Sequence, residues 1–198
     1  MKIIKEQITI RNESIILTNQ RALFWEREQV LVLSDLHVGK TAHFRKHGIP
    51  IPDDILKEDL NRLSALIHYF NPLNIYIVGD LFHAEANMNM EYFHNWQSQY
   101  GELKMTLIKG NHDKLPEYWI SKLDLIVETK ITVAPFFFVH DPSEDKGDYF
   151  AISGHIHPGV LIKGRGRQKL KLPCYAITED ELILPAFSKF TGLNSKYG

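Results

Sequence analysis

The chain has 198 residues, one cysteine and a formal net charge of −1 at pH 7. Its 44% hydrophobic content excludes a disordered chain, and its length predicts one domain spanning residues 1–198. The single cysteine, Cys174, excludes a disulfide framework, and the balanced charge means that any nucleic-acid site must be a local patch. No apolar run is long enough for a membrane span or a signal peptide, so we expect a cytoplasmic protein that contacts no membrane.

The first half of the chain predicts strands that alternate with helices. A mostly apolar run at residues 30–34 is typical of a fully buried strand, and further runs follow at residues 74–78 and 104–108. Helices are predicted between them, over residues 53–70 and 87–100. This β-α-β-α-β order predicts parallel strands joined by right-handed crossovers.

The first of these helices has the clearest pattern. Its apolar residues repeat at helical spacing: Leu56, Leu60, Leu63, Ile67 and Phe70. Pro52 and Asp53 are typical of a helix start, and Asn71 with Pro72 of its end. Short strands separated by turns are predicted over residues 3–25, 126–139, 149–153, 160–163, 169–172, 175–178 and 181–184.

Five apolar runs in the sequence are each followed closely by residues of the types that bind metal ions. Because buried strands of one sheet can end at a common edge, we expect these side chains to converge there. The candidate ligands are Asp35, His37, Asp80, Asn111, His140, His155 and His157, with His112 as a further candidate.

This set is too large for a single ion. One ion that keeps a position open for water takes three or four protein ligands. Two ions that share a carboxylate fit better, and Asp80 is the expected bridge because it follows the middle strand of the β-α-β-α-β segment. Imidazole, carboxylate and amide ligands without a thiolate favour Mn²⁺ as the first expectation, with Fe or Zn as alternatives.

The ordered motifs resemble those of the calcineurin-like metallophosphoesterases. They read DxH, GD, GNHD, a histidine after an apolar strand, and GHxH, between residues 30 and 157. Four further segments resemble one subgroup, the bacterial ligase-associated DNA damage response endonucleases: LHVGKTAHFRKHGIPIP, GDLFH, HDP and LILPAFSKFTG. The resemblance implies an α/β fold, a four-layer sandwich of two mixed β-sheets flanked by helices.

The resemblance also implies roles for the ligands. Asp35, His37, Asp80 and His157 would hold one ion, and Asp80, Asn111, His140 and His155 the other. A hydroxide bridging the two ions would attack phosphorus in line.

Three residues beside the ligands have expected roles in catalysis. His112 is left free to donate a proton or hydrogen bond to a substrate oxygen. Asp113 would either orient that imidazole or cap a loop. His83 would support a ligand, touch substrate, or be an ordinary loop histidine.

Two basic segments are candidates for DNA contact. The alternatives are a solvated helix for the first segment and a hairpin whose charges guard a sheet edge for the second. In the second segment every cation lies at an odd position, so cations on the strands can share one face. The segments comprise Lys40, Arg45 and Lys46, and then Lys163, Arg165, Arg167, Lys169 and Lys171.

We therefore expect a two-metal phosphodiesterase, a DNA endonuclease that acts in DNA repair. DNA is the expected partner, with an ATP-dependent DNA ligase and a DEXH-box helicase implied by the subgroup resemblance. The alternatives are a phosphoesterase for a nucleotide or a nucleotide-lipid diphosphate, and a protein-binding scaffold with a dead site. The presence of every ligand and of His112 argues against the scaffold.

Overall fold

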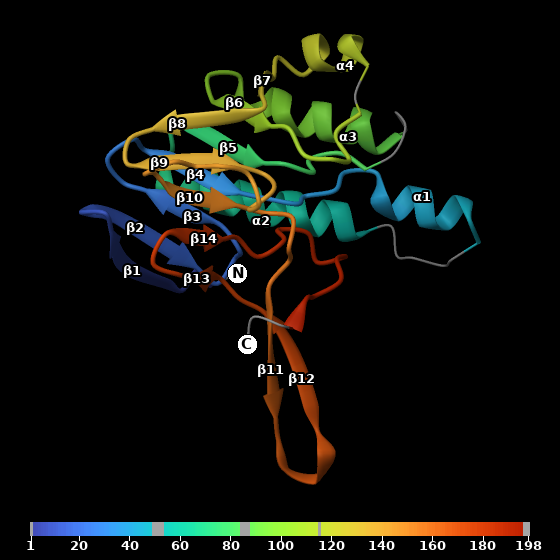
Figure 1. Ribbon diagram of the computed structural model, residues 1–198. Helices are drawn as coiled ribbons and strands as arrows, with labels where there is room; N and C mark the ends of the chain where they lie inside the picture. Colours follow the sequence, from blue (N-terminus) through green and yellow to red (C-terminus); the bar gives the residue numbers. More distant parts are fainter. Residues whose placement is uncertain (1, 49–53, 84–87, 115, 196–198) are drawn as a thin grey trace.

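The computed structural model describes residues 2–48, 54–83, 88–114 and 116–195. It contains two mixed β-sheets packed face to face, with helices against the first sheet (Figure 1). The expected α/β class, the calcineurin-like sandwich, is confirmed.

The larger sheet has seven strands in chain order. It joins an antiparallel half, as far as the fourth strand, to a parallel half from the fourth strand onward. Its strands are β1 (Lys5–Ile10), β2 (Glu13–Thr18), β3 (Leu23–Trp25), β4 (Val30–Leu33), β5 (Asn74–Val78), β6 (Lys104–Ile108) and β7 (Ile126–Glu128).

The second sheet has five strands in the order β13-β14-β10-β9-β8. Its three central strands, β14, β10 and β9, run parallel. The five strands of this sheet are β8 (Lys130–Val133), β9 (Phe136–Val139), β10 (Phe150–Ser153), β13 (Ala176–Ile177) and β14 (Glu181–Ile183).

The helices are α1 (Lys40–Lys46), α2 (Asp54–Phe70), α3 (Met88–Gln97) and α4 (Glu117–Lys122), with 3₁₀ turns at Ser98–Tyr100 and Arg165–Arg167. The apolar stripe predicted for α2 is buried from Leu56 to Ile67, and Phe70 is half-buried. The predicted helix start at Pro52 and Asp53, and residue 87 before α3, lie outside the described residues. Helix α4 was not predicted, because six residues are too few to show a helical period.

Two apolar cores explain why β4 is wholly apolar and why β5 and β6 are mostly apolar after their first residues. Leu31 and Leu33 face the core beneath α2 and α3, whereas Val30 and Val32 face the core between the two sheets. The interior of a strand buried on both faces has no position for a charged side chain. Polar ligands must therefore follow the strands, at their carboxyl ends.

A two-stranded hairpin projects away from the sheets (Figure 1). It consists of β11 (Gly159–Lys163) and β12 (Lys169–Pro173), and it begins two residues after His157. Lys163 pairs with Lys169, so these side chains lie on the same face. None of the described helices is long and apolar enough to cross a membrane.

Candidate metal centre

The predicted ligands meet where the parallel strands of both sheets end. Asp35 and His37 follow β4, Asp80 follows β5, and Asn111 follows β6. The ligands from the second sheet are His140, after β9, and His155 and His157, after β10. Six of these residues form two groups of ligand atoms, and within each group all the atoms lie within 4.8 Å of one another.

The first group contains Asp35, His37 and His157. The Nε2 atom of His157 lies 3.1 Å from Oδ1 of Asp35, whose side chain is fully buried. Both ring nitrogens of His37 are buried without a hydrogen-bond partner among the described residues. Because unpaired buried polar atoms are costly, the donor set fits a cation.

The pKa of His37 is also suited to metal binding. Burial, together with the positive charge of Lys40, lowers the pKa of His37 to about 3, although Asp35 and Asp80 act to raise it. The imidazole is therefore neutral near pH 7 and has a lone pair available for a metal.

The second group contains Asp80, His140 and His155. Nε2 of His140 lies 3.4 Å from Oδ2 of Asp80, 3.3 Å from Nδ1 of His155 and 3.2 Å from Oδ1 of Asn111. The other ring nitrogen of His140 lies 3.0 Å from the carbonyl oxygen of Val78. This contact orients Nε2 toward the ligands, as backbone partners commonly do for metal-binding histidines.

Asp80 and His140 stabilise each other's charged forms. Burial lowers the pKa of His140, but hydrogen bonding to Asp80 and the charge of Asp35 outweigh burial and raise it to about 9. Burial raises the pKa of Asp80, but the hydrogen bond and charge of His140 and the hydrogen bond from the backbone of His112 together outweigh burial and hold that pKa below its usual range. A cation between these groups would replace the proton on His140.

Contacts between the loops connect the two groups. The backbone N–H of His155 donates to Oδ2 of Asp35 at 3.3 Å. The backbone N–H of His112 donates to Oδ1 of Asp80 at 3.0 Å, so the other oxygen of Asp80 is the one that faces His140. The negative charge of Asp80 also acts on His37 of the first group.

The ligand loops have unusual backbone geometry. A left-handed conformation outside glycine costs about 1–3 kcal/mol and is commonest at functional sites. Five predicted ligands have φ angles between 50° and 66°: Asp35, His37, Asp80, His155 and His157.

Two glycines in the motifs make room for ligands. A Cβ atom on Gly79 would lie 2.0 Å from Nδ1 of His140, and one on Gly110 would lie 2.3 Å from Oδ1 of Asp80. Both motifs therefore need glycine for this close approach, and Gly79, with a φ angle of 78°, needs it for backbone geometry as well.

His112 lies beside the first group. Its ring centroid is 5.8 Å from that of His37 and 4.8 Å from that of His83, and the His83 ring is 5.5 Å from His37. The His112 side chain is exposed, which leaves it accessible to a substrate.

Asp113 is buried and binds backbone groups. Its two carboxylate oxygens accept hydrogen bonds from the N–H groups of Phe82 at 2.9 Å and Gly110 at 2.8 Å. Burial raises the pKa of Asp113 to about 6 despite these bonds. The contacts join the loops after β5 and β6, so they match the loop-capping role rather than orientation of the His112 ring.

The two basic segments differ in position. Lys40 is half-buried, and Asp35 and Asp80 act on it electrostatically, which places it beside the metal centre. Arg45 is half-buried on α1, and the side chain of Lys46 lies outside the described residues. All five hairpin cations are exposed: Lys163, Arg165, Arg167, Lys169 and Lys171.

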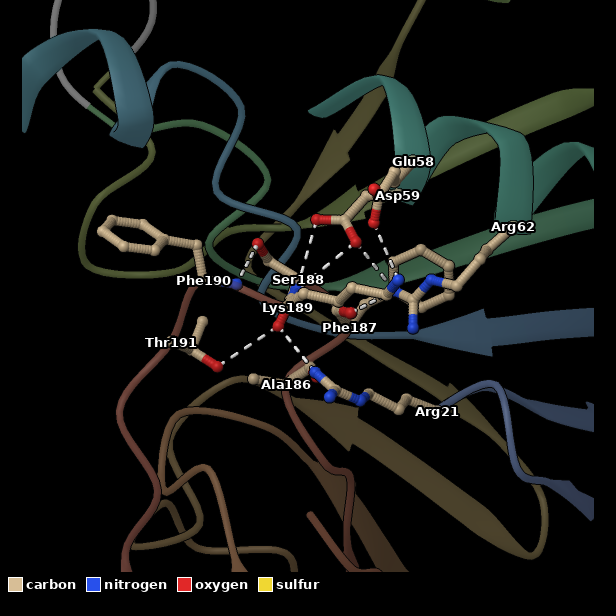
Figure 2. A network of polar contacts seen from close by, with 10 residues as sticks. All are labelled: Arg21, Glu58, Asp59, Arg62, Ala186, Phe187, Ser188, Lys189, Phe190 and Thr191. Carbon is tan, nitrogen blue, oxygen red and sulfur yellow. Dashed lines mark hydrogen bonds and ion pairs between the residues drawn. The ribbon is translucent and has the colours of Figure 1, made fainter. Parts of the chain in front are cut away.

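Sequence reasoning missed two buried charged residues on α2, Asp59 and Arg62. Their Oδ1 and guanidinium nitrogen are 3.0 Å apart, and both residues bind the segment after β14 (Figure 2). Two signals were available in the sequence. The residues are spaced i, i+3 next to the apolar stripe of α2, and the segment belongs to the subgroup-like motif LILPAFSKFTG.

Comparisons with known proteins identify the family of the chain. The nuclease MPE from Pseudomonas putida has a similar solved structure, with 29% identity, a TM-score of 0.84, and coverage of 97% of this chain and 91% of that one. Yfce, a phosphoesterase from E. coli, has 14% identity and a TM-score of 0.42, with coverage of 79% and 77%. No curated protein sequence matches the chain. The sequence model of calcineurin-like phosphoesterases matches residues 29–188, so the chain belongs to this family of metal-dependent phosphoesterases.

Proposed function

We propose that this phosphoesterase uses two metal ions to cleave phosphodiester bonds in DNA, as an endonuclease of DNA repair. The observation that carries the proposal is the pair of adjacent ligand groups at one sheet edge. Similarity over nearly the full chain to a protein described as a nuclease supports the choice of substrate. A role beside an ATP-dependent DNA ligase and a DEXH-box helicase belongs to the proposal and rests on the subgroup resemblance.

The ligand groups define how the ions would be held. Asp35, His37 and His157 would bind one ion, and His140, His155 and Asn111 the other. Asp80 would contribute to both. Two divalent ions, with Mn²⁺ as the first choice, neutralise phosphate charge and lower the pKa of water.

The remaining residues would act on the substrate. His112, exposed beside the first group, would donate a proton to the leaving oxygen. Lys40 would offset negative charge near Asp35 and Asp80. His83, next to both His37 and His112, is positioned to touch the same substrate.

A nuclease must accept a phosphate with an ester on both sides. We therefore expect Mn²⁺-loaded protein to hydrolyse bis-aryl phosphate and DNA far faster than mono-aryl phosphate. The measurement is the initial rate on each substrate, including single-stranded DNA, duplex DNA and a nucleotide monoester. Rapid monoester or diphosphate hydrolysis without any DNA cleavage would contradict the DNA assignment and favour a small-molecule substrate.

The hairpin cations provide a separate test of polymer binding. Arg165→Gln combined with Arg167→Gln should weaken DNA binding and reduce the slope of log affinity against log salt by about one for each lost phosphate contact. Turnover of bis-aryl phosphate should be nearly unchanged, because the tip of the projecting hairpin would touch only the polymer. DNA binding is measured by fluorescence anisotropy over a salt series.

The matched control removes the same charge elsewhere. Lys57→Gln with Lys104→Gln neutralises two exposed lysines outside the hairpin. An equal fall in the salt slope for both double variants would show that the hairpin has no particular role.

A further inference from the structure

The segment after β14 holds the loops that carry the metal ligands. We call residues 184–194 the C-terminal clamp. It contacts both sheets: the N–H of Leu184 donates to the carbonyl of Ser153, the last residue of β10, and the N–H of Phe187 donates to the carbonyl of Ser34 after β4, both at 2.8 Å.

Two clamp residues hydrogen-bond directly to ligand backbones. The N–H of Ser188 donates to the carbonyl of Asp35 at 3.1 Å, and the N–H of Asn194 donates to the carbonyl of His157 at 2.9 Å. Both ligands belong to the first group and both have left-handed backbones. Such conformations persist where surrounding contacts hold them.

The ligands of the second group have other support. His140 is oriented by the carbonyl of Val78, and its own carbonyl accepts the N–H of Gly154 at 3.2 Å. Asp80 accepts the N–H of His112. The clamp therefore bears more directly on the first group than on the second.

Two buried residues of α2 fix the clamp in place (Figure 2). Asp59 is 1% exposed and accepts the N–H of Lys189 at 3.3 Å. Arg62 donates to Oδ1 of Asp59 and to the carbonyl of Phe187, and its guanidinium lies 4.3 Å from the centre of the Phe187 ring. A buried charge pair that also binds backbone groups defines one geometry, since removal of either partner leaves the other unpaired.

Arg21 adds a third anchor from the turn between β2 and β3. Its guanidinium donates to the carbonyls of Ala186 at 3.3 Å and Ser188 at 2.8 Å. The clamp is thus held on one side by α2 and on another by the first sheet.

We propose that the buried Asp59–Arg62 pair, acting through the C-terminal clamp, positions Asp35 and His157 and thereby sets the affinity of one metal site selectively. Asp59 and Arg62 are positioning residues, because they bind the clamp rather than the ion. The inference rests on the proposed two-metal function.

The test is Asp59→Asn, with Glu58→Gln as the matched control. Glu58 is the adjacent residue on α2 and binds the side chain of Lys189 at 2.8 Å, but this pair is exposed and contributes little. Metal-free full-length protein is titrated with Mn²⁺ by calorimetry. We expect two sites in the wild type and in Glu58→Gln, whereas Asp59→Asn should keep one site and weaken the other about 10–100-fold, the range for outer-shell partners.

Electron paramagnetic resonance identifies the weakened site. The wild type with two equivalents of Mn²⁺ should give the spectrum of a coupled pair, and Asp59→Asn that of a single ion. The latter should match His157→Ala, which disrupts the first group, and differ from His140→Ala, which disrupts the second. If Asp59→Asn does not fold, Arg21→Gln is the second variant. It removes a half-exposed anchor of the clamp and should lower the Mn²⁺ affinity of the same site.

The outcomes separate the two proposals. A wild type that binds a single Mn²⁺ contradicts the two-metal function and the inference with it. Two ions in the wild type, with both affinities unchanged in the clamp variants or lowered equally, overturn the inference alone. An effect of Glu58→Gln as large as that of Asp59→Asn also overturns it, because the buried pair would then have no special role.

Discussion

Asp80→Asn is expected to lose metal and activity together. Asp80 follows the central strand β5, faces His140 with one oxygen and acts electrostatically on His37 of the other group. Loss of its charge removes the proposed shared ligand, so the fall in Mn²⁺ affinity should exceed the roughly 10–100-fold cost of losing an outer-shell partner. Metal content per chain and kcat on bis-aryl phosphate are the measurements.

Asp148→Asn is the control, since it removes one carboxylate charge from an exposed loop. It should retain metal content and rate. If Asp80→Asn still binds two ions per chain with wild-type affinity, Asp80 does not bridge them, and the ligand set would have to be divided differently.

His112→Ala is expected to separate chemistry from metal binding. The imidazole is exposed next to His37, and the hydrogen bond to Asp80 comes from the backbone N–H, which alanine retains. Both ions should therefore remain bound while kcat on DNA falls by about 10²–10⁴-fold, as is usual for a lost general acid. The loss should be much smaller for bis-nitrophenyl phosphate, whose leaving group needs no proton.

His68→Ala is the matched histidine control, because His68 is exposed on α2. Its rates should equal those of the wild type on both substrates. Equal losses for good and poor leaving groups in His112→Ala would exclude proton donation and indicate charge stabilisation at a non-bridging oxygen.

Much of the candidate site could be predicted because its position follows from burial. The runs that became β4, β5 and β6 are mostly apolar, and the sheet buries both of their faces. Polar residues after such runs are confined to the strand ends, and parallel strands place those ends on one edge. The order of these residues along the chain was therefore enough to predict that Asp35, Asp80 and Asn111 lie close together.

The role of Asp113 needed the tertiary structure. Proximity to His112 in the chain left orientation of the imidazole and loop capping equally open. The fold brings the N–H of Phe82, 31 residues away, to the buried carboxylate. A hydrogen bond between distant loops leaves no periodic signal in the sequence.

Residue types and their order at the strand ends were enough to specify a set of oxygen and imidazole ligands. What supports those ligands from outside the site follows from the folded chain alone. Asp59 and Arg62 look like ordinary charges in a helix until the chain brings Phe187 and Lys189 against them. Periodicity reports which face of an element is buried, whereas the partner of a buried charge depends on segments that meet only in the folded chain.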